Sequence, residues 1–340
     1  METGLSQRIQ KGLAEKRQNL NDWLAGTPAE EKAIHLGPAG EAGLMSHLEM
    51  LDTALEQAAD QTLGLCEVCQ GTVDSELLEM DYTACVCLDH FTEQERRQLE
   101  AELELSHAVQ RALLPQGPPA IPGLDLAAFS RPAQIVGGDY YDFFQFRDGT
   151  QALAVADVEG HGVSAGMLMS SLQTSLRTLI PESTSPVDVL QRVNRFYLHN
   201  IHLTTFVTIF IGLFDARRRE LTYCNAGHNP PLLVRAGSGG TCWLSPTGPA
   251  IGLVEEYTLT AQTIPLSPGD VLLLYTDGVT EAMSSQGEQF GPERLEAVTS
   301  QNAGLPAGEL VQLVRQALSD HIGGQPLADD TTLVACRLEN

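Results

Sequence analysis

The chain has 340 residues, 43% of them hydrophobic, which is enough for about two domains with cores of their own. Its 44 acidic and 20 basic residues give a formal net charge of −24. Because such a charge repels nucleic acids and anionic lipids, we expect neither nucleic acid nor membrane as a partner. The polar start and the lack of a run of about 18 apolar residues predict a cytoplasmic protein without a transmembrane span.

Residues 1–91 are predicted to form a helical region that ends in a cysteine-rich segment. Leu44, Leu48, Leu51 and Leu55 recur at the spacing of one helix face. Residues 63–91 then hold four of the seven cysteines. This clustering favours a metal site in a reducing compartment over a disulfide framework.

The cysteine spacing predicts a zinc site once a histidine is counted with it. Cys66 and Cys69 form one pair separated by two residues, and Cys87 and His90 form a second. Two such pairs are typical of a four-coordinate structural zinc site with no open position for chemistry. Two alternatives remain: Cys85 replaces Cys87 as the ligand, or these two cysteines form a redox pair, although their disulfide would be strained.

The stretches LGLCEVC and LLEMDYTACVCLDH resemble the zinc finger of DksA/TraR proteins, over about residues 42–100. In that family the last ligand is usually Cys, and His90 is a conservative replacement for tetrahedral zinc. The resemblance implies one structural Zn²⁺ that stabilises a small module for docking or sensing.

A long charged helix and a proline-rich linker are expected over residues 92–118. Thr92 and Glu95 have the spacing of a capping box, and the helical pattern ends at Pro115. A partial apolar stripe along this helix is interrupted by Ser106 and Gln110. The helix is therefore either a short coiled coil, through which the chain would form a homodimer, or a solvated connector.

From residue 119 to residue 340 the pattern changes to short β-type runs and helical stretches. The strands come in runs rather than in strict alternation with helices, which favours an α+β layered fold over a parallel doubly wound sheet. The expected strands are 124–130, 139–146, 151–158, 205–214, 220–226, 231–235, 270–277 and 331–338. The expected helices lie near 164–180, 186–200, 291–300 and 307–321.

Acidic residues stand where several of these strands begin or end. Asp157 follows the apolar run LAVA, Asp277 follows VLLLY, and Asp329 and Asp330 precede TTLVAC; Asp139 opens DYYDFF. Carboxylates that meet at one rim repel each other unless a hard cation such as Mg²⁺ or Mn²⁺ binds them. Each acid alone is more typical of a turn, so the interpretation depends on the whole set.

The stretches IVGGDYYDFF, ADVEGHGVSAGMLM, NAGHNPPLL, GDVLLLYTDGVTEA and ADDTTLV resemble the metal-dependent PPM-type protein phosphatases of the SpoIIE/RsbU branch. They occur in the family's order over roughly residues 105–338. The resemblance implies a four-layer αββα sandwich of two antiparallel sheets, preceded here by the small helical zinc-finger module. It also implies that two Mg²⁺ or Mn²⁺ ions activate a water that hydrolyses phosphoserine or phosphothreonine on a protein.

The resemblance assigns roles residue by residue. Asp157 and Asp277 are implied to be catalytic. In wider relatives a His follows an Asp-Gly pair, whereas His161 is displaced here. The implied Mg²⁺ or Mn²⁺ ligands are Asp139, Asp157, the carbonyl of Val158, Asp277, Asp329 and, in a supporting role, Asp330.

The branch also implies a partner, a phosphorylated regulatory protein of the kind that antagonises an anti-sigma factor, with the zinc module as regulator. A second hypothesis is a non-catalytic adaptor whose zinc module binds a partner such as RNA polymerase. A third is a two-metal phosphodiesterase acting on a nucleotide. The presence of Asp139, Asp157, Asp277 and Asp329 argues against the adaptor.

Overall fold

The computed structural model describes residues 13–14, 17–18, 21, 40–60, 62–66, 68–69, 71, 73, 87, 90, 92–160, 162–200, 206–215, 217–237, 240–254, 257–325 and 327–339. The chain divides into two compact units. The first is Met1–Glu102 with His199–Thr204, and the second is Leu103–Leu198 with Thr205–Asn340. No helix in the described part of the chain is both long and apolar enough to cross a membrane.

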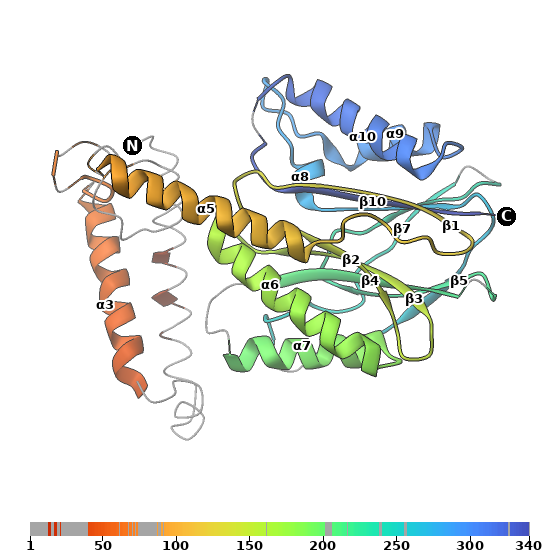
Figure 1. Ribbon diagram of the computed structural model, residues 1–340, viewed down its shortest axis with the longest axis horizontal. Coiled ribbons are helices and arrows are strands. Elements are labelled where there is room, and N and C mark those ends of the chain that lie inside the picture. Colours follow the sequence, from red (N-terminus) through yellow and green to blue (C-terminus); the bar gives the residue numbers. More distant parts are fainter. Residues whose placement is uncertain are drawn as a thin grey trace. The chain divides into compact units, whose positions relative to one another are not determined.

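Two five-stranded antiparallel sheets form the centre of the second unit (Figure 1). The first sheet has the order β1 (Leu124–Arg131), β10 (Thr331–Leu338), β9 (Val271–Tyr275), β6 (Leu232–Val234) and β7 (Thr241–Trp243). The second has the order β2 (Tyr140–Gln145), β3 (Gln151–Val158), β4 (Val207–Asp215), β5 (Glu220–Ala226) and β8 (Gln262–Pro265).

Helices cover the outer face of each sheet, so the second unit has four layers (Figure 1). The longer helices are α6 (Gly162–Leu179) and α7 (Pro186–Asn200) on one side, and α9 (Gly291–Gln301) and α10 (Ala307–Ile322) on the other. Two short helices are η3 (Ile180–Glu182) and α8 (Asp277–Thr280). The α+β sandwich of two antiparallel sheets predicted from the sequence is therefore confirmed.

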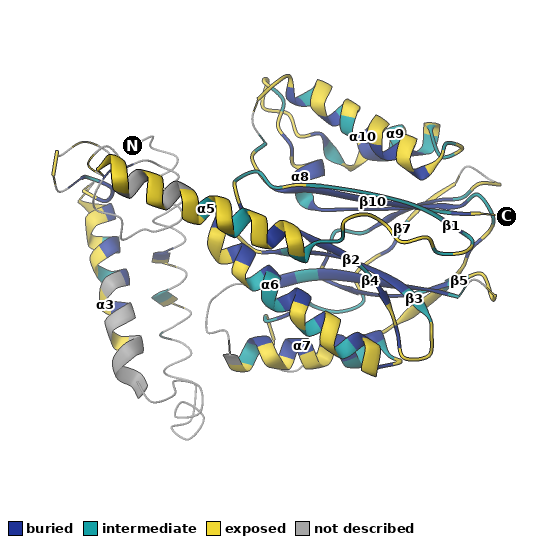
Figure 2. Cartoon of the chain, in the orientation of Figure 1, coloured by how far each residue is buried: buried dark blue, intermediate teal, exposed yellow. Residues whose placement is uncertain are grey.

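Alternating apolar side chains explain why the sheets pack on both faces. On β9, Leu272 and Leu274 point into the core between the sheets, whereas Leu273 and Tyr275 pack with the α9–α10 side. The inner strands are accordingly buried along their length (Figure 2). Each fully buried side chain of this size contributes about 1.5–3 kcal/mol.

The eight predicted strands and four predicted helices of this unit are all present, with small differences at their ends. The prediction missed β7 and β8, whose side chains are mostly exposed. Both are short edge strands, so neither carries an apolar alternation that sequence reading can detect.

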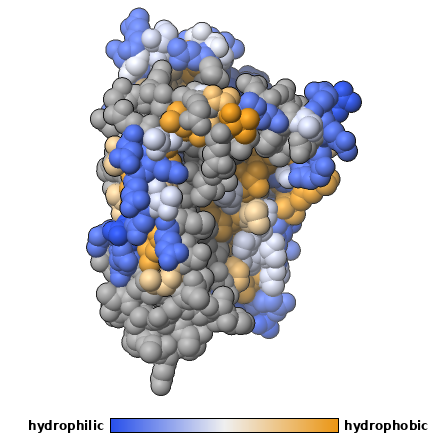
Figure 3. All heavy atoms as spheres, turned by 90° about the vertical axis from the view of Figure 1, so that its left-hand side faces the viewer, coloured by the Kyte–Doolittle hydropathy of each residue, from blue (hydrophilic) through white to orange (hydrophobic). Residues whose placement is uncertain are grey.

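In the first unit, α3 (Gly40–Ala59) buries Leu48, Leu51 and partly Leu55 of the predicted apolar face, while the side chain of Leu44 lies outside the described residues. Leu48 and Leu51 are buried in a small core with Leu63. Glu49 and Glu56 are exposed on the opposite side of α3, where Met45 is also exposed, and Figure 3 shows mostly hydrophilic with some hydrophobic residues on this face of the molecule. The helix expected over the linker is α5 (Glu93–Leu113), whose residues from Leu103 onward belong to the second unit.

Candidate functional site

The predicted acidic residues lie at the ends of strands from both sheets. Asp157 is near the end of β3 and Asp139 directly precedes β2. Asp277 begins α8 just after β9, while Asp329 and Asp330 directly precede β10. Electrostatic interactions link Asp157 with Asp277, Asp329 and Asp330, and Asp139 with Asp157 and Asp330. The structure therefore brings these five residues, which we call the acid cluster, together across the two sheets.

Burial and mutual repulsion make the acid cluster costly to ionise. Burial, together with the charges of Asp277 and Asp329, raises the pKa of Asp157 to about 8. Burial, with the charges of Asp157 and Asp330, raises the pKa of Asp139 well above its usual value. None of the ion pairs formed by described residues joins a basic side chain to the cluster.

Asp277 gives the most direct indication of the kind of ligand that the acid cluster suits. Its Oδ1 is buried and has no hydrogen-bond partner among the described residues. Burial also raises its pKa to about 6, with further contributions from Asp329 and Glu281. An unpaired buried carboxylate oxygen among other carboxylates fits a hard divalent cation, because oxygen ligands are what Mg²⁺ and Mn²⁺ prefer.

Val158 follows Asp157, and its carbonyl lies against the loop that carries Asp139. A Cβ on Gly138 would stand 2.8 Å from the carbonyl oxygen of Val158. Glycine at this position therefore allows the loop to approach the end of β3. The predicted carbonyl ligand and the predicted carboxylate ligand consequently lie on neighbouring backbone segments.

Asp330 holds the same loop through its side chain. Oδ1 accepts a hydrogen bond from the backbone N–H of Ala133 at 2.7 Å, and Oδ2 accepts one from that of Gly138 at 2.6 Å. A Cβ on Gly137 would overlap this carboxylate. Asp330 therefore positions the segment that ends in Asp139, and its supporting role as a metal ligand stays a prediction.

Thr276 is a site residue that sequence reasoning missed. Its Oγ1 donates to Oδ2 of Asp139 at 2.7 Å and accepts the backbone N–H of Thr332 at 2.9 Å. The hydroxyl therefore ties a buried carboxylate to the backbone of β10. Its position directly before Asp277 is the one signal that the sequence contained.

Gln110 of α5 is a second residue that was missed. Its Nε2 donates to the carbonyl of Gly137 at 2.6 Å, and its Oε1 accepts the N–H of Gly137 at 3.1 Å. The side chain is 7% exposed. The signal in the sequence was a polar residue that interrupts an apolar stripe. The side-chain amide of Gln110 is buried against this loop.

The predicted zinc ligands also come together. One ligand atom from each of Cys66, Cys69, Cys87 and His90 lies within 4.8 Å of the others. We call these four residues the Cys/His cluster. The two Sγ atoms of Cys69 and Cys87 are 3.7 Å apart, close to the ~3.8 Å edge of a tetrahedron with Zn–S bonds of ~2.3 Å. Cys85, the alternative ligand, lies outside the described residues, as does His161.

Backbone N–H groups point at the sulfur atoms of the Cys/His cluster. The N–H of Cys87 lies 3.4 Å from Sγ of Cys66, and that of Gly71 lies 3.4 Å from Sγ of Cys69. Although burial raises the pKa of Cys66, hydrogen bonds from the backbone N–H groups of Cys87, Cys69 and Val68 lower it to about 6. Burial and the two neighbouring thiols raise the pKa of Cys87 to about 11. A bound cation would favour the ionised form of the Cys87 thiol.

Comparison with known proteins identifies relatives for the second unit. The family described as Stage II sporulation protein E (SpoIIE) matches residues 147–339. Protein IcfG of Synechocystis sp. is 32% identical over 262 residues, which cover 69% of this chain but 41% of IcfG. Phosphoserine phosphatase RsbU of Bacillus subtilis is 29% identical over 242 residues, which cover 71% of each protein.

A solved structure shows the same fold. The SiaA-PP2C domain of Pseudomonas aeruginosa superposes with a TM-score of 0.64 at 23% identity. The match covers 73% of this chain and 100% of that domain. This similarity shows the fold. Among the sequence relatives, the chain spans less than half the length of IcfG.

Asp330→Ala is expected to lower the free energy of unfolding by about 2–4 kcal/mol, because two backbone N–H groups lose their acceptor. Asp330→Asn keeps one oxygen and should cost about half as much. Urea denaturation measures both. The control is Asp329→Ala, since Asp329 is exposed and accepts a single N–H. Equal losses for the two alanine variants would contradict the loop-holding role of Asp330.

Proposed function

The chain belongs to the SpoIIE family of protein phosphatases, and we propose that it hydrolyses phosphoserine or phosphothreonine on a regulatory protein with Mg²⁺ or Mn²⁺. The observation that carries this proposal is the acid cluster, in which buried and half-buried carboxylates converge without a basic partner among the described residues. Kinship with the phosphoserine phosphatase RsbU supports the reaction class.

Asp157 and Asp277 are the residues that would hold two divalent ions, together with Asp139, Asp329 and the carbonyl of Val158. When bound, the ions supply a nucleophilic water at neutral pH and neutralise charge on the phosphoryl group. The chain's own contribution is to fix the ligands: Thr276 orients Asp139, and the backbone N–H groups of Ala133 and Gly138 hold Asp330.

The proposed substrate is a phosphorylated regulatory protein, such as an antagonist of an anti-sigma factor, which is the class that the resemblance to the SpoIIE/RsbU branch implies. The adaptor hypothesis receives less support. A scaffold without catalysis would have no reason to keep an unpaired buried carboxylate oxygen on Asp277, because that oxygen only costs stability.

Asp157→Asn is expected to lower the hydrolysis of p-nitrophenyl phosphate and of a phosphoserine protein with Mn²⁺ by about 100-fold or more. The same change should raise the melting temperature of the metal-free protein, by about 2–4 °C per kcal/mol of relieved repulsion, and remove most of the stabilisation by Mn²⁺.

The matched control for that experiment is Asp148→Asn, in the exposed turn between β2 and β3. It should keep both the activity and the response of the melting temperature to Mn²⁺. Full activity of Asp157→Asn would refute the metal assignment. The proposed phosphatase activity would be refuted if the unaltered protein hydrolysed neither substrate, also after removal of residues 1–100.

We further propose that the Cys/His cluster holds one structural Zn²⁺ and that the zinc module regulates or docks the phosphatase. The donor set of three sulfurs and one imidazole suits zinc, since its ligand atoms lie within 4.8 Å of one another and Sγ of Cys69 and Sγ of Cys87 are 3.7 Å apart. The small core around Leu51 is about the size that needs such a metal for stability. Similarity to DksA/TraR zinc fingers stays a prediction.

Metal analysis of the purified chain is expected to find one zinc per molecule. Cys66→Ser, Cys69→Ser and Cys87→Ser should each lose zinc, because each removes a thiolate ligand. Cys85→Ser and the control Cys242→Ser, an exposed cysteine of β7, should keep it. Loss of zinc from Cys85→Ser would show that Cys85, and not Cys87, completes the site.

The linker helix α5 is the proposed route of regulation, because Gln110 contacts the loop that carries Asp139. We expect Gln110→Ala to raise the Mn²⁺ concentration for half-maximal activity about fivefold or more, the effect of a coupling of about 1 kcal/mol. Gln116→Ala is the control, since Gln116 bonds only to carbonyls at the end of α5. An unchanged Mn²⁺ dependence would contradict this coupling. Homodimer formation through α5 stays a prediction.

A further inference from the structure

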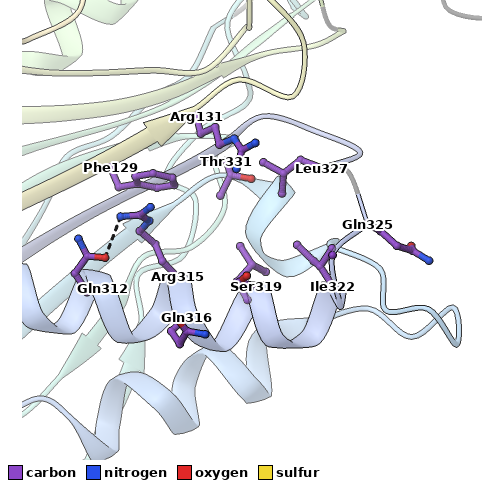
Figure 4. A pocket seen from close by; sticks show the side chains of 12 residues that line it. Phe129, Arg131, Gln312, Arg315, Gln316, Ser319, Ile322, Gln325, Leu327 and Thr331 are labelled. Carbon is purple, nitrogen blue, oxygen red and sulfur yellow. Dashed lines mark hydrogen bonds between the residues drawn. The ribbon is translucent and has the colours of Figure 1, made fainter.

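A cavity of about 280 Å³ lies between β1 and α10 (Figure 4). Phe129 and Arg131 line it from β1, Arg315 and Ser319 line it from α10, and Thr331 lines it from β10. We call this cavity the arginine pocket. Neither the acid cluster nor the Cys/His cluster includes any of these residues.

The charge of the arginine pocket is opposite to that of the chain. Its lining residues include two arginines and no acidic residue, whereas the chain has a net charge of −24. Among described residues, neither Arg131 nor Arg315 forms an ion pair. The pocket is therefore a place where an anion is attracted to a molecule that otherwise repels anions.

The guanidinium of Arg315 is held in a fixed orientation. It lies 3.8 Å from the centre of the Phe129 ring and donates to Oε1 of Gln312 at 3.0 Å, as Figure 4 shows. A guanidinium has five N–H donors, so these two contacts leave most of them for a ligand. A planar group that is already oriented pairs with a carboxylate or a phosphoryl group through two parallel hydrogen bonds.

The arginine pocket adjoins the acid cluster. Arg131 pairs with Thr331 in the ladder between β1 and β10. Thr331 follows Asp329 and Asp330 in the chain, and two residues span at most ~7 Å. The backbone N–H of Ala133, two residues beyond Arg131, bonds to Asp330. A protein chain bound at the acid cluster is therefore within reach of Arg131, which lines the arginine pocket together with Arg315.

We propose that the arginine pocket binds an anionic side chain of the phosphoprotein substrate, next to the residue that is dephosphorylated. This inference rests on the proposed phosphatase function and adds a determinant of substrate choice to it. The ligand is a carboxylate or a second phosphoryl group, since both have the geometry that a guanidinium recognises. Acidic residues beside the phosphorylated residue of the substrate therefore increase its hydrolysis, although the phosphatase chain as a whole is acidic.

Synthetic phosphoserine peptides test this proposal on the full chain with Mn²⁺. Each peptide carries one glutamate, one second phosphoserine or, as the neutral reference, one glutamine, moved through the flanking positions in turn. We expect at least one position at which an anionic residue raises kcat/KM about tenfold over glutamine. The glutamate and phosphoserine series show which of the two anions the pocket prefers.

Arg315→Gln and Arg131→Gln are expected to bring this ratio of kcat/KM values close to one, and Arg315→Lys should keep part of it. Because the ratio compares two peptides on the same variant, a general loss of activity does not alter it. Arg217→Gln, an exposed arginine in the turn between β4 and β5, is the control and should keep the full ratio.

Two results would overturn the role of the pocket: a ratio near one at every position in the unaltered chain, or a full ratio in Arg315→Gln. Hydrolysis of p-nitrophenyl phosphate without hydrolysis of any peptide would also count against it. If the unaltered chain hydrolysed neither the peptides nor p-nitrophenyl phosphate, the proposed function would be refuted, and the role of the arginine pocket with it.

Discussion

The carboxylates of Asp139, Asp157 and Asp277 repel one another at the rim where two sheets meet, and the rest of the second unit resists that repulsion. Their burial removes the water that would screen them, as the raised pKa values of all three show. The two cores around the sheets supply the stability that keeps these charges together. A divalent cation turns the same crowding from a cost into binding energy.

Positioning of the acids depends on one loop that is fixed from several sides. Gly137 is held by Gln110 of α5, and Gly138 is held by Asp330 from the start of β10. Thr276, from the end of β9, then holds the carboxylate of Asp139. Elements far apart in sequence thus contact one small segment, so a shift in any of them reaches the carboxylate of Asp139.

The strands and site residues that could be predicted from the sequence are those marked by a local pattern. An apolar run followed by an acid at a turn is a local signal, and it identified β3 with Asp157 and β9 with Asp277. The contacts that fix the site are not local: Gln110 and Gly137 are 27 residues apart, and Asp330 and Gly138 are 192 apart. Such pairings follow only from the packed fold. The edge strands β7 and β8 were missed because exposed edges need no apolar alternation.

Gly137 and Asp330 also constrain how this chain can change over generations. A side chain at position 137 would occupy the space of the Asp330 carboxylate, while a shorter residue at position 330 would leave two backbone donors unpaired. Neither position can drift alone without loss. Among descendants of this chain, the two positions should therefore covary, with a new side chain at one appearing only together with a compensating change at the other.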